Sequence, residues 1–144
     1  MKKIFIIILS LIFCLSVNSI AKENFFKDAK NKYDKEQIED SKFLFQRNIV
    51  FNPKHAKSYL YLAKIYNLEE NEIEELKNLK TTLLLDPENE EAMYMLIEIE
   101  LEKSNFSKVE DLTKKFNIIC SKFCNKKQTI EEKLKDIQAK QENN

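Results

Sequence analysis

Two cysteines in the stretch CSKFC are the residues whose type and spacing come closest to a chemical site. Cys120 and Cys124 stand four positions apart. In a regular helix this spacing puts the two Cα atoms about 6.2 Å apart, within the range of about 4.4 to 6.8 Å that a disulfide requires. We therefore expect a structural disulfide between them. The alternatives are two inert thiols, or a pair with a redox or metal function.

A metal site would need further ligands beside the two thiols. Cys-x3-Cys with a remote histidine resembles the copper site of certain exported metallochaperones, but those proteins carry it on a thioredoxin-like fold with a βαβ core, which this sequence does not have. His55 is the only histidine, and we expect it on the surface at a helix start. We predict no metal and no cofactor. A thiol redox or copper-handling protein that uses Cys120 and Cys124 is the alternative function.

The other reactive residue types form no catalytic pattern. The sequence has one His, no Gly and no Ser embedded in a nucleophile turn, which leaves only the many carboxylates. Pairs such as Glu74 with Glu75 and Glu131 with Glu132 are expected to be solvated charge on exposed helix faces. We predict no catalytic residue and no enzymatic activity.

The first residues have the layout of a secretory signal peptide. Lys2 and Lys3 precede an apolar run of 14 residues, Ile4 to Val17, and small residues follow at Ser19 and Ala21. The run is shorter than the roughly 20 residues that a membrane-spanning helix needs. We expect cleavage after Ala21, so that residues 1–21 are a signal peptide of bacterial type and the mature protein is periplasmic or secreted. A retained anchor is the alternative.

A lipoprotein signal is a further alternative for the N-terminal segment, and the charge of the remaining chain bears on its partners. A lipoprotein signal would use Cys14, but bulky Phe13 precedes it and more apolar sequence follows it, which disfavours lipidation. Without residues 1–21 the chain keeps 22 basic and 24 acidic residues, and their signs are interspersed. We predict no nucleic-acid partner, because nucleic-acid binding requires a concentrated basic surface.

Composition and periodicity together predict an all-α fold. Two prolines and no glycine leave little turn chemistry for β-hairpins. Tyr59, Leu62, Ala63 and Tyr66 follow the spacing of one helix face, and a polar break comes next. A second apolar stripe then runs to Asp86-Pro87, where the residue before proline disfavours helix. This second stripe consists of Ile73, Leu76, Leu79 or Lys80, and Leu83.

Looser copies of this helical hairpin lie on both sides of it. Pro53 and Pro87 close successive hairpins and are 34 residues apart, a period typical of helical repeat arrays. The upstream copy has the stripes Phe25, Phe26, Ala29, Tyr33 and Ile38, Ser41, Phe45, Ile49. The downstream copy has Met93, Leu96, Ile97 and Phe106, Val109, Leu112, Phe116, and it ends near Cys120.

The middle copy resembles the tetratricopeptide repeat, whose pattern contains an aromatic residue, a Leu followed by a small residue, a Tyr and a closing Pro. The matching positions are Tyr59, Leu62, Ala63, Tyr66, Leu79 and Pro87. The outer copies depart from the pattern at Asp28 and Lys32, and at Ile97 and Glu100. The resemblance implies an all-α solenoid of three hairpins, with degenerate outer units. The expected units are 22–55, 56–89 and 90–124, followed by a capping helix and polar tail at 125–144.

The C-terminal segment is expected to cover the open face of the third hairpin. Thr129 with Glu132 predicts a capping box at the start of a helix. Ile130, Leu134 and Ile137 form a narrow apolar stripe on that helix. A frayed tail is expected from about Ala139.

Tetratricopeptide arrays usually hold a peptide on their concave side, which the first helix of each hairpin lines. By this resemblance, the predicted partner-binding residues are Phe26, Lys30, Tyr33, Leu60, Lys64, Asn67, Tyr94, Glu98 and Leu101. Their mixture of aromatic, aliphatic and charged groups suits peptide capture. The alternative is that each of them only packs neighbouring hairpins together. Phe26 and Leu60 stand where a Lys would grip a terminal carboxylate, so that class of ligand is disfavoured.

The sequence therefore predicts an exported, non-catalytic scaffold or adaptor that binds a protein or peptide partner on its concave surface. A structural subunit of a larger, membrane-associated complex is a third interpretation. The identity of the partner does not follow from the residues.

Overall fold

The structure is a computed structural model that describes residues 25–142. The predicted signal peptide, its cleavage site at Ala21 and Cys14 lie outside the described residues. Residues 25–34 are helical. The helices that follow are α2 (Ile38–Phe51), α3 (Ala56–Leu68), α4 (Glu72–Leu85), α5 (Glu90–Glu102), α6 (Phe106–Ile119) and α7 (Lys126–Glu142).

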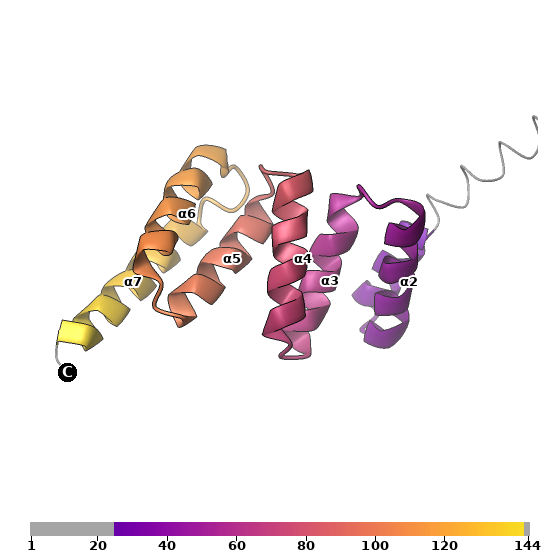
Figure 1. Ribbon diagram of the computed structural model, residues 1–144, viewed down its shortest axis with the longest axis horizontal. Helices are drawn as coiled ribbons and strands as arrows, with labels where there is room; N and C mark the ends of the chain where they lie inside the picture. Colours follow the sequence, from indigo (N-terminus) through magenta and orange to yellow (C-terminus); the bar gives the residue numbers. More distant parts are fainter. Residues whose placement is uncertain (1–24, 143–144) are drawn as a thin grey trace, which may run out of the picture.

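The helices stand side by side in one row, from residues 25–34 and α2 at one end to α6 and α7 at the other (Figure 1). Consecutive helices pair as hairpins: residues 25–34 with α2, α3 with α4, and α5 with α6. No strand occurs within residues 25–142. The predicted all-α solenoid is confirmed. None of the helices in this part of the chain is both long and apolar enough to cross a membrane.

The turn inside each hairpin is built the same way in all three. Glu36, Glu70 and Ser104 have positive φ values of 59°, 55° and 55°, and they stand at the same place in successive hairpins. In the first hairpin the N–H of Glu36 donates to the Tyr33 carbonyl at 2.9 Å, and the N–H of the next residue donates to the Lys32 carbonyl at 3.0 Å. This is the Schellman arrangement that ends many helices, usually with glycine at the left-handed position. The chain makes it three times without glycine.

The apolar stripes pack into two clusters that meet at α3. One cluster joins the middle and third hairpins to α7, with Ile97 and Phe116 fully buried at its centre. The other joins the first hairpin to α3 through Phe45 and Ile65. Because α3 contributes Leu60 and Ala63 to the first cluster and Leu62 and Ile65 to the second, it links both halves of the row.

One stripe position and the capping box differ from the prediction. Ile73 is 80% exposed, whereas Leu79 of the same stripe is fully buried. Ile73 stands in the first turn of α4, on the side of the helix that faces away from its neighbours. The capping box is also wrong, because α7 begins at Lys126 and Thr129 already lies inside the helix. The helix also continues through Glu142, beyond Ala139.

The predicted covering role of the last helix is seen in its contacts. Ile130 is 1% exposed and joins the larger core cluster, and Leu134 and Ile137 pack against that cluster. Lys133 Nζ on α7 contacts Glu98 Oε1 on α5 at 2.7 Å. Because α7 buries only a narrow stripe, the rest of its described surface is left for polar side chains.

Candidate functional site

A groove of about 610 Å³ runs across the first helices of the hairpins. We call this feature the groove. It begins at residues 25–34, crosses α3 and the start of α5, and ends at the loop between α6 and α7. Its lining residues are Phe26, Lys30, Lys57, Leu60, Tyr61, Glu88, Asn89, Glu90, Glu91, Ser121, Lys122 and Phe123.

The N-terminal wall of the groove is aromatic. The ring of Tyr61 stacks on Phe45 with centroids 4.9 Å apart, and Phe26 meets its edge at 5.9 Å. Tyr33 contacts Tyr61 edge-on at 5.1 Å. These rings hold one another in place, so the faces of Phe26 and Tyr61 that line the groove are positioned before any ligand arrives. A rigid aromatic wall loses little conformational entropy when it binds.

A half-buried ion pair connects the aromatic wall to the next hairpin. Lys64 Nζ contacts Glu91 Oε1 at 2.8 Å and lies 5.1 Å from the centre of the Tyr61 ring. Burial lowers the pKa of Lys64, but the hydrogen bond and charge of Glu91 outweigh burial and leave the pKa raised. The lysine therefore stays charged. The pair connects the start of α5 to α3 beside the groove.

The C-terminal wall of the groove is a loop held by one carboxylate. Glu90 Oε2 accepts hydrogen bonds from the N–H groups of Ser121, Lys122 and Phe123 at 2.7, 2.9 and 2.8 Å. Ser121 Oγ donates to the other oxygen at 2.7 Å. Three successive N–H groups aimed at one anion form a nest. The N–H of Phe123, with the other donors, lowers the pKa of Glu90 to about 2.

The same loop carries the two cysteines. Cys120 and Cys124 form a disulfide, and their Cα atoms lie 5.2 Å apart, within the range that such a bridge requires. Cys120 ends α6 in extended backbone, so the bridge closes just after the helix rather than inside it. Closing so short a loop contributes about 2 kcal/mol on the chain-entropy model. The bridge therefore helps to hold the loop in the shape that presents its N–H groups to Glu90.

A second, smaller hollow of about 380 Å³ lies between the turn of the middle hairpin and α5. It is lined by Asn67, Glu70, Glu72, Glu75, Met95, Glu98, Ile99 and Glu102. Glu75 is only 5% exposed, so the prediction that it is solvated surface charge is wrong. Burial raises its pKa, and the Asn67 amide donates to both of its oxygens at 3.2 and 3.3 Å. Lys103 and Lys133 already neutralise two other carboxylates of the hollow, Glu72 and Glu98.

The predicted partner-binding residues divide into three groups. Phe26, Lys30 and Leu60 line the groove, and Tyr33 and Lys64 support its aromatic wall. Asn67 and Glu98 line the acidic hollow instead.

The remaining two, Tyr94 and Leu101, line neither hollow and are buried in the larger core cluster, where Leu101 is 2% exposed. Leu60 belongs to the same cluster and is 6% exposed, although it also lines the groove. Burial and the hydrogen bond to Glu98 raise the pKa of Tyr94 to about 12. Their burial is the packing alternative that the sequence left open. Partner binding by the other seven stays a prediction.

His55 is half-buried rather than on the surface. It stands just before α3, as expected, but its ring packs on Phe26 with centroids 4.5 Å apart, and Nδ1 lies 2.9 Å from Ser58 Oγ. Burial, together with the charge of Lys57, lowers its pKa. Within residues 25–142 no group of three or more His, Cys, Asp or Glu side chains is arranged to hold a metal ion.

The sequence did not predict those groove residues that lie outside the inward-facing repeat positions of each hairpin's first helix. Glu90 and the loop residues Ser121 to Phe123 are 31 to 33 residues apart in the chain. No local pattern links them. The signal that was available is the placement of CSKFC directly after the third hairpin, which puts this loop beside the start of α5.

The fold has counterparts among solved structures. It is similar to SycD, the type III secretion translocator chaperone of Yersinia enterocolitica, with a TM-score of 0.72 and 17% identity over 86% of this chain and 88% of that chain. SycD in complex with a peptide of the translocator YopD gives a TM-score of 0.68 and 16% identity over 83% of this chain and 93% of that chain. The tetratricopeptide domain of Sgt2 from Aspergillus fumigatus gives 0.62 and 10% identity over 85% of this chain and 80% of that chain.

These similarities establish a tetratricopeptide-like helical repeat fold. No protein-family model matches the sequence, and no curated protein matches it. At such low identity the likeness concerns the fold alone, and function has to be argued from the groove.

Proposed function

We propose that the protein is an exported, non-catalytic adaptor that binds a segment of a partner protein in the groove. The observation that carries this proposal is the groove itself: a hollow of about 610 Å³ that crosses all three hairpins and has a preformed aromatic wall. Concave surfaces with rigid aromatic anchors and a polar rim are typical of peptide recognition. The SycD structure with a YopD peptide is an example of a similar fold that holds a peptide.

The chemistry of the lining indicates what kind of segment would fit. Phe26, Leu60 and Phe123 offer apolar contact, whereas Lys57 on α3 and Lys122 on the loop after α6 are exposed cations. Two of the lining carboxylates, Glu90 and Glu91, are already bound by the loop N–H groups and by Lys64. A segment with an apolar side chain flanked by carboxylates would bury the apolar group and pair its charges at the rim. The rim pairs would mainly affect the association rate and its dependence on salt.

Site-specific photo-crosslinking tests this proposal in the cells that produce the protein. A photoreactive residue at Lys57 or Lys122 should crosslink one shared protein, and mass spectrometry should map both crosslinks to a single segment of it. The control is the same residue at Lys80, an exposed lysine on α4 that does not line the groove. Equal crosslinking of that protein from Lys80 would contradict the proposal.

Affinity for the mapped segment gives the second measurement. Lys57→Glu combined with Lys122→Glu should weaken binding of the synthetic segment by about tenfold and remove most of its salt dependence. Lys80→Glu with Lys115→Glu makes the same change of charge elsewhere and should leave the affinity unchanged. Equal losses in both double variants would show that net charge, not the groove, governs binding.

The exported part of the proposal is supported by the sequence of residues 1–21. N-terminal sequencing of the protein from a non-cytoplasmic fraction should find Lys22 as the first residue. A protein that keeps Met1 and stays in the cytoplasm would contradict export while leaving the groove proposal intact.

A further inference from the structure

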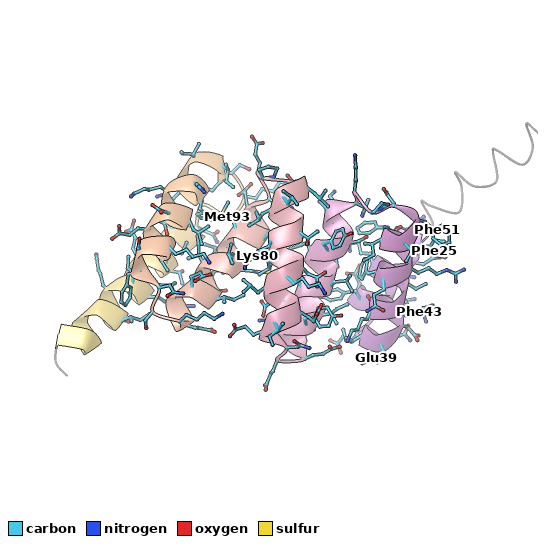
Figure 2. The ribbon with its side chains drawn as sticks, in the orientation of Figure 1. Phe25, Glu39, Phe43, Phe51, Lys80 and Met93 are labelled. Carbon is cyan, nitrogen blue, oxygen red and sulfur yellow. A yellow bond between two sulfur atoms is a disulfide. The ribbon has the colours of Figure 1, made fainter. Side chains whose placement is uncertain are left out.

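One face of α2 exposes large apolar side chains at the N-terminal end of the row. Phe43 is 60% exposed, Val50 76% and Phe51 47%. Positions 43, 47, 50 and 51 fall on one side of a helix. Figure 2 shows Phe43 and Phe51 together with Phe25 and Glu39 along the outer edge of the molecule, at the end away from α7. We call this surface, made of Glu39, Phe43, Arg47, Val50, Phe51 and Phe25, the end face.

The end face differs from the other exposed apolar positions. Leu68, Ile73, Leu84 and Ile118 are scattered over α3, α4 and α6. Single exposed apolar residues are normal in proteins, whereas a contiguous patch marks an interaction surface. Repeat arrays also require their terminal units to be capped. The end face is therefore the place in the described chain where a partner is most needed.

Its charges are arranged symmetrically about Phe43. Glu39 stands four residues before Phe43, and Arg47 stands four residues after it. Neither charge has a salt-bridge partner among the side chains that the structure describes. The guanidinium of Arg47 lies 4.5 Å from the centre of the Phe25 ring, which itself stacks on Phe51 at 5.5 Å. Arg47 is thus held on the face by cation–π contact while its charge remains available.

This pattern is complementary to itself under a twofold axis. If two α2 helices cross antiparallel with Phe43 at the axis, residue 39 of each helix faces residue 47 of the other, because the two positions are equally far from 43. Glu39 then meets Arg47 twice, and the two Phe43 rings meet at the centre. An interface in which residue i contacts j and j contacts i is the isologous contact of symmetric dimers. We propose that the end face binds the end face of a second copy of this chain, with Phe43 and the two Glu39–Arg47 pairs at the centre of the contact and Val50 and Phe51 at its edge.

The proposal leaves the groove free, because the groove and the end face have no lining residue in common. It therefore does not depend on the proposed function. The other occupants of the end face are the chain's own residues 1–24 and a different protein, and both would leave the purified protein monomeric.

Sedimentation of the purified product of the full-length gene tests the proposal. The wild-type protein should show a concentration-dependent monomer–dimer equilibrium that weakens at high salt. Glu39→Arg and Arg47→Glu each place like charges opposite one another twice, so each should raise the dissociation constant by about tenfold or more. Both positions are exposed, and circular dichroism should show that both variants keep the fold.

Mixing the two variants gives the decisive result. In a mixed dimer the arginine introduced by Glu39→Arg faces the glutamate introduced by Arg47→Glu, and the second pair keeps its natural residues, Arg47 of one chain and Glu39 of the other. The mixture should therefore associate about as well as wild type, while each variant alone does not. The control Ile118→Glu changes an exposed apolar residue on α6 and should leave dimerisation unaltered. A monomeric wild-type protein, or a mixture that associates no better than its components, would overturn the proposal.

Discussion

At the C-terminal end of the row, α7 places Ile130 in the core and a carboxylate-bound loop closes the groove, whereas at the N-terminal end α2 turns Phe43 and Phe51 to solvent. The hairpins behind the two ends are alike: each is an antiparallel helix pair with the same turn. The two ends differ in what covers the terminal hairpin. A repeat array buries its internal faces by stacking, but each terminal face needs a cover that the repeat cannot supply.

The largest change in stability that tests this comparison is expected when one buried and one exposed apolar side chain are each truncated to alanine. Ile130→Ala should lower the free energy of unfolding by about 2–4 kcal/mol, because it removes a buried side chain and leaves a cavity. Phe43→Ala should change it by less than about 0.5 kcal/mol, because the side chain is mostly exposed in the single chain. Urea denaturation followed by circular dichroism measures both values at protein concentrations too low for association.

A control variant shows whether the small effect of Phe43→Ala comes from the exposure of the side chain or from its place at the end of the row. Leu84→Ala removes an apolar side chain that is as exposed as Ile73, on a helix inside the row. It should behave like Phe43→Ala. If Phe43→Ala instead lost as much stability as Ile130→Ala, the N-terminal end would be covered in the single chain and the contrast between the ends would fail.

The Glu90 carboxylate should make the stability of the C-terminal end of the row depend on pH. The pKa of Glu90 is lowered from 4.5 to about 2. The stability that comes from its hydrogen bonds is therefore complete above about pH 4.5 and is lost as the pH falls toward 2. Glu90→Gln should lower stability at pH 7 and should flatten the acid limb of the stability profile, measured by urea denaturation from neutral pH downward.

The matched control for this variant lies at the other end. Glu39→Gln also removes one carboxylate charge from the first turn of a helix, but no loop N–H group binds Glu39 in the described structure. Both variants are measured at protein concentrations too low for association, so that the proposed contact of Glu39 with a second chain does not contribute. If Glu90→Gln and Glu39→Gln gave the same stability profiles, the nest around Glu90 would contribute nothing specific, and the two ends would be electrostatically equivalent.

The apolar periodicity was enough to predict the helices and most of the core. Positions such as Phe45, Leu79 and Ile130 are buried because a helix that buries a stripe must bury its three- and four-residue neighbours too. The prediction that Ile73 is buried was wrong because the stripe begins in the first turn of α4, where a side chain can still face outward. Periodicity says which side of a helix is apolar, not how far a neighbour covers it.

The groove was less predictable because it depends on contacts between distant residues. Leu101 and Tyr94 matched the family pattern for an inward-facing position, yet α7 covers that part of α5 and buries them. Glu75 was expected to be solvated, but the hairpin turn places the Asn67 amide against it. Both outcomes depend on which segment packs where, and a local pattern contains no such information.

The hairpin turns give the smallest and most local test of the comparison. Glu36 and Ser104 hold left-handed backbone at φ values of 59° and 55°, which costs a residue with a Cβ about 1 kcal/mol. Glu36→Gly and Ser104→Gly should each raise the free energy of unfolding by about 0.5–1 kcal/mol, since the relief of strain exceeds the added entropy of the unfolded chain. The gains should be equal at both ends, because the turns are the same and only the covers differ.

Urea denaturation of the two single variants measures these gains. Lys35→Gly, one residue before the left-handed position of the first turn, is the control variant and should instead lose stability. Unequal gains would place part of the difference between the ends in the hairpins themselves.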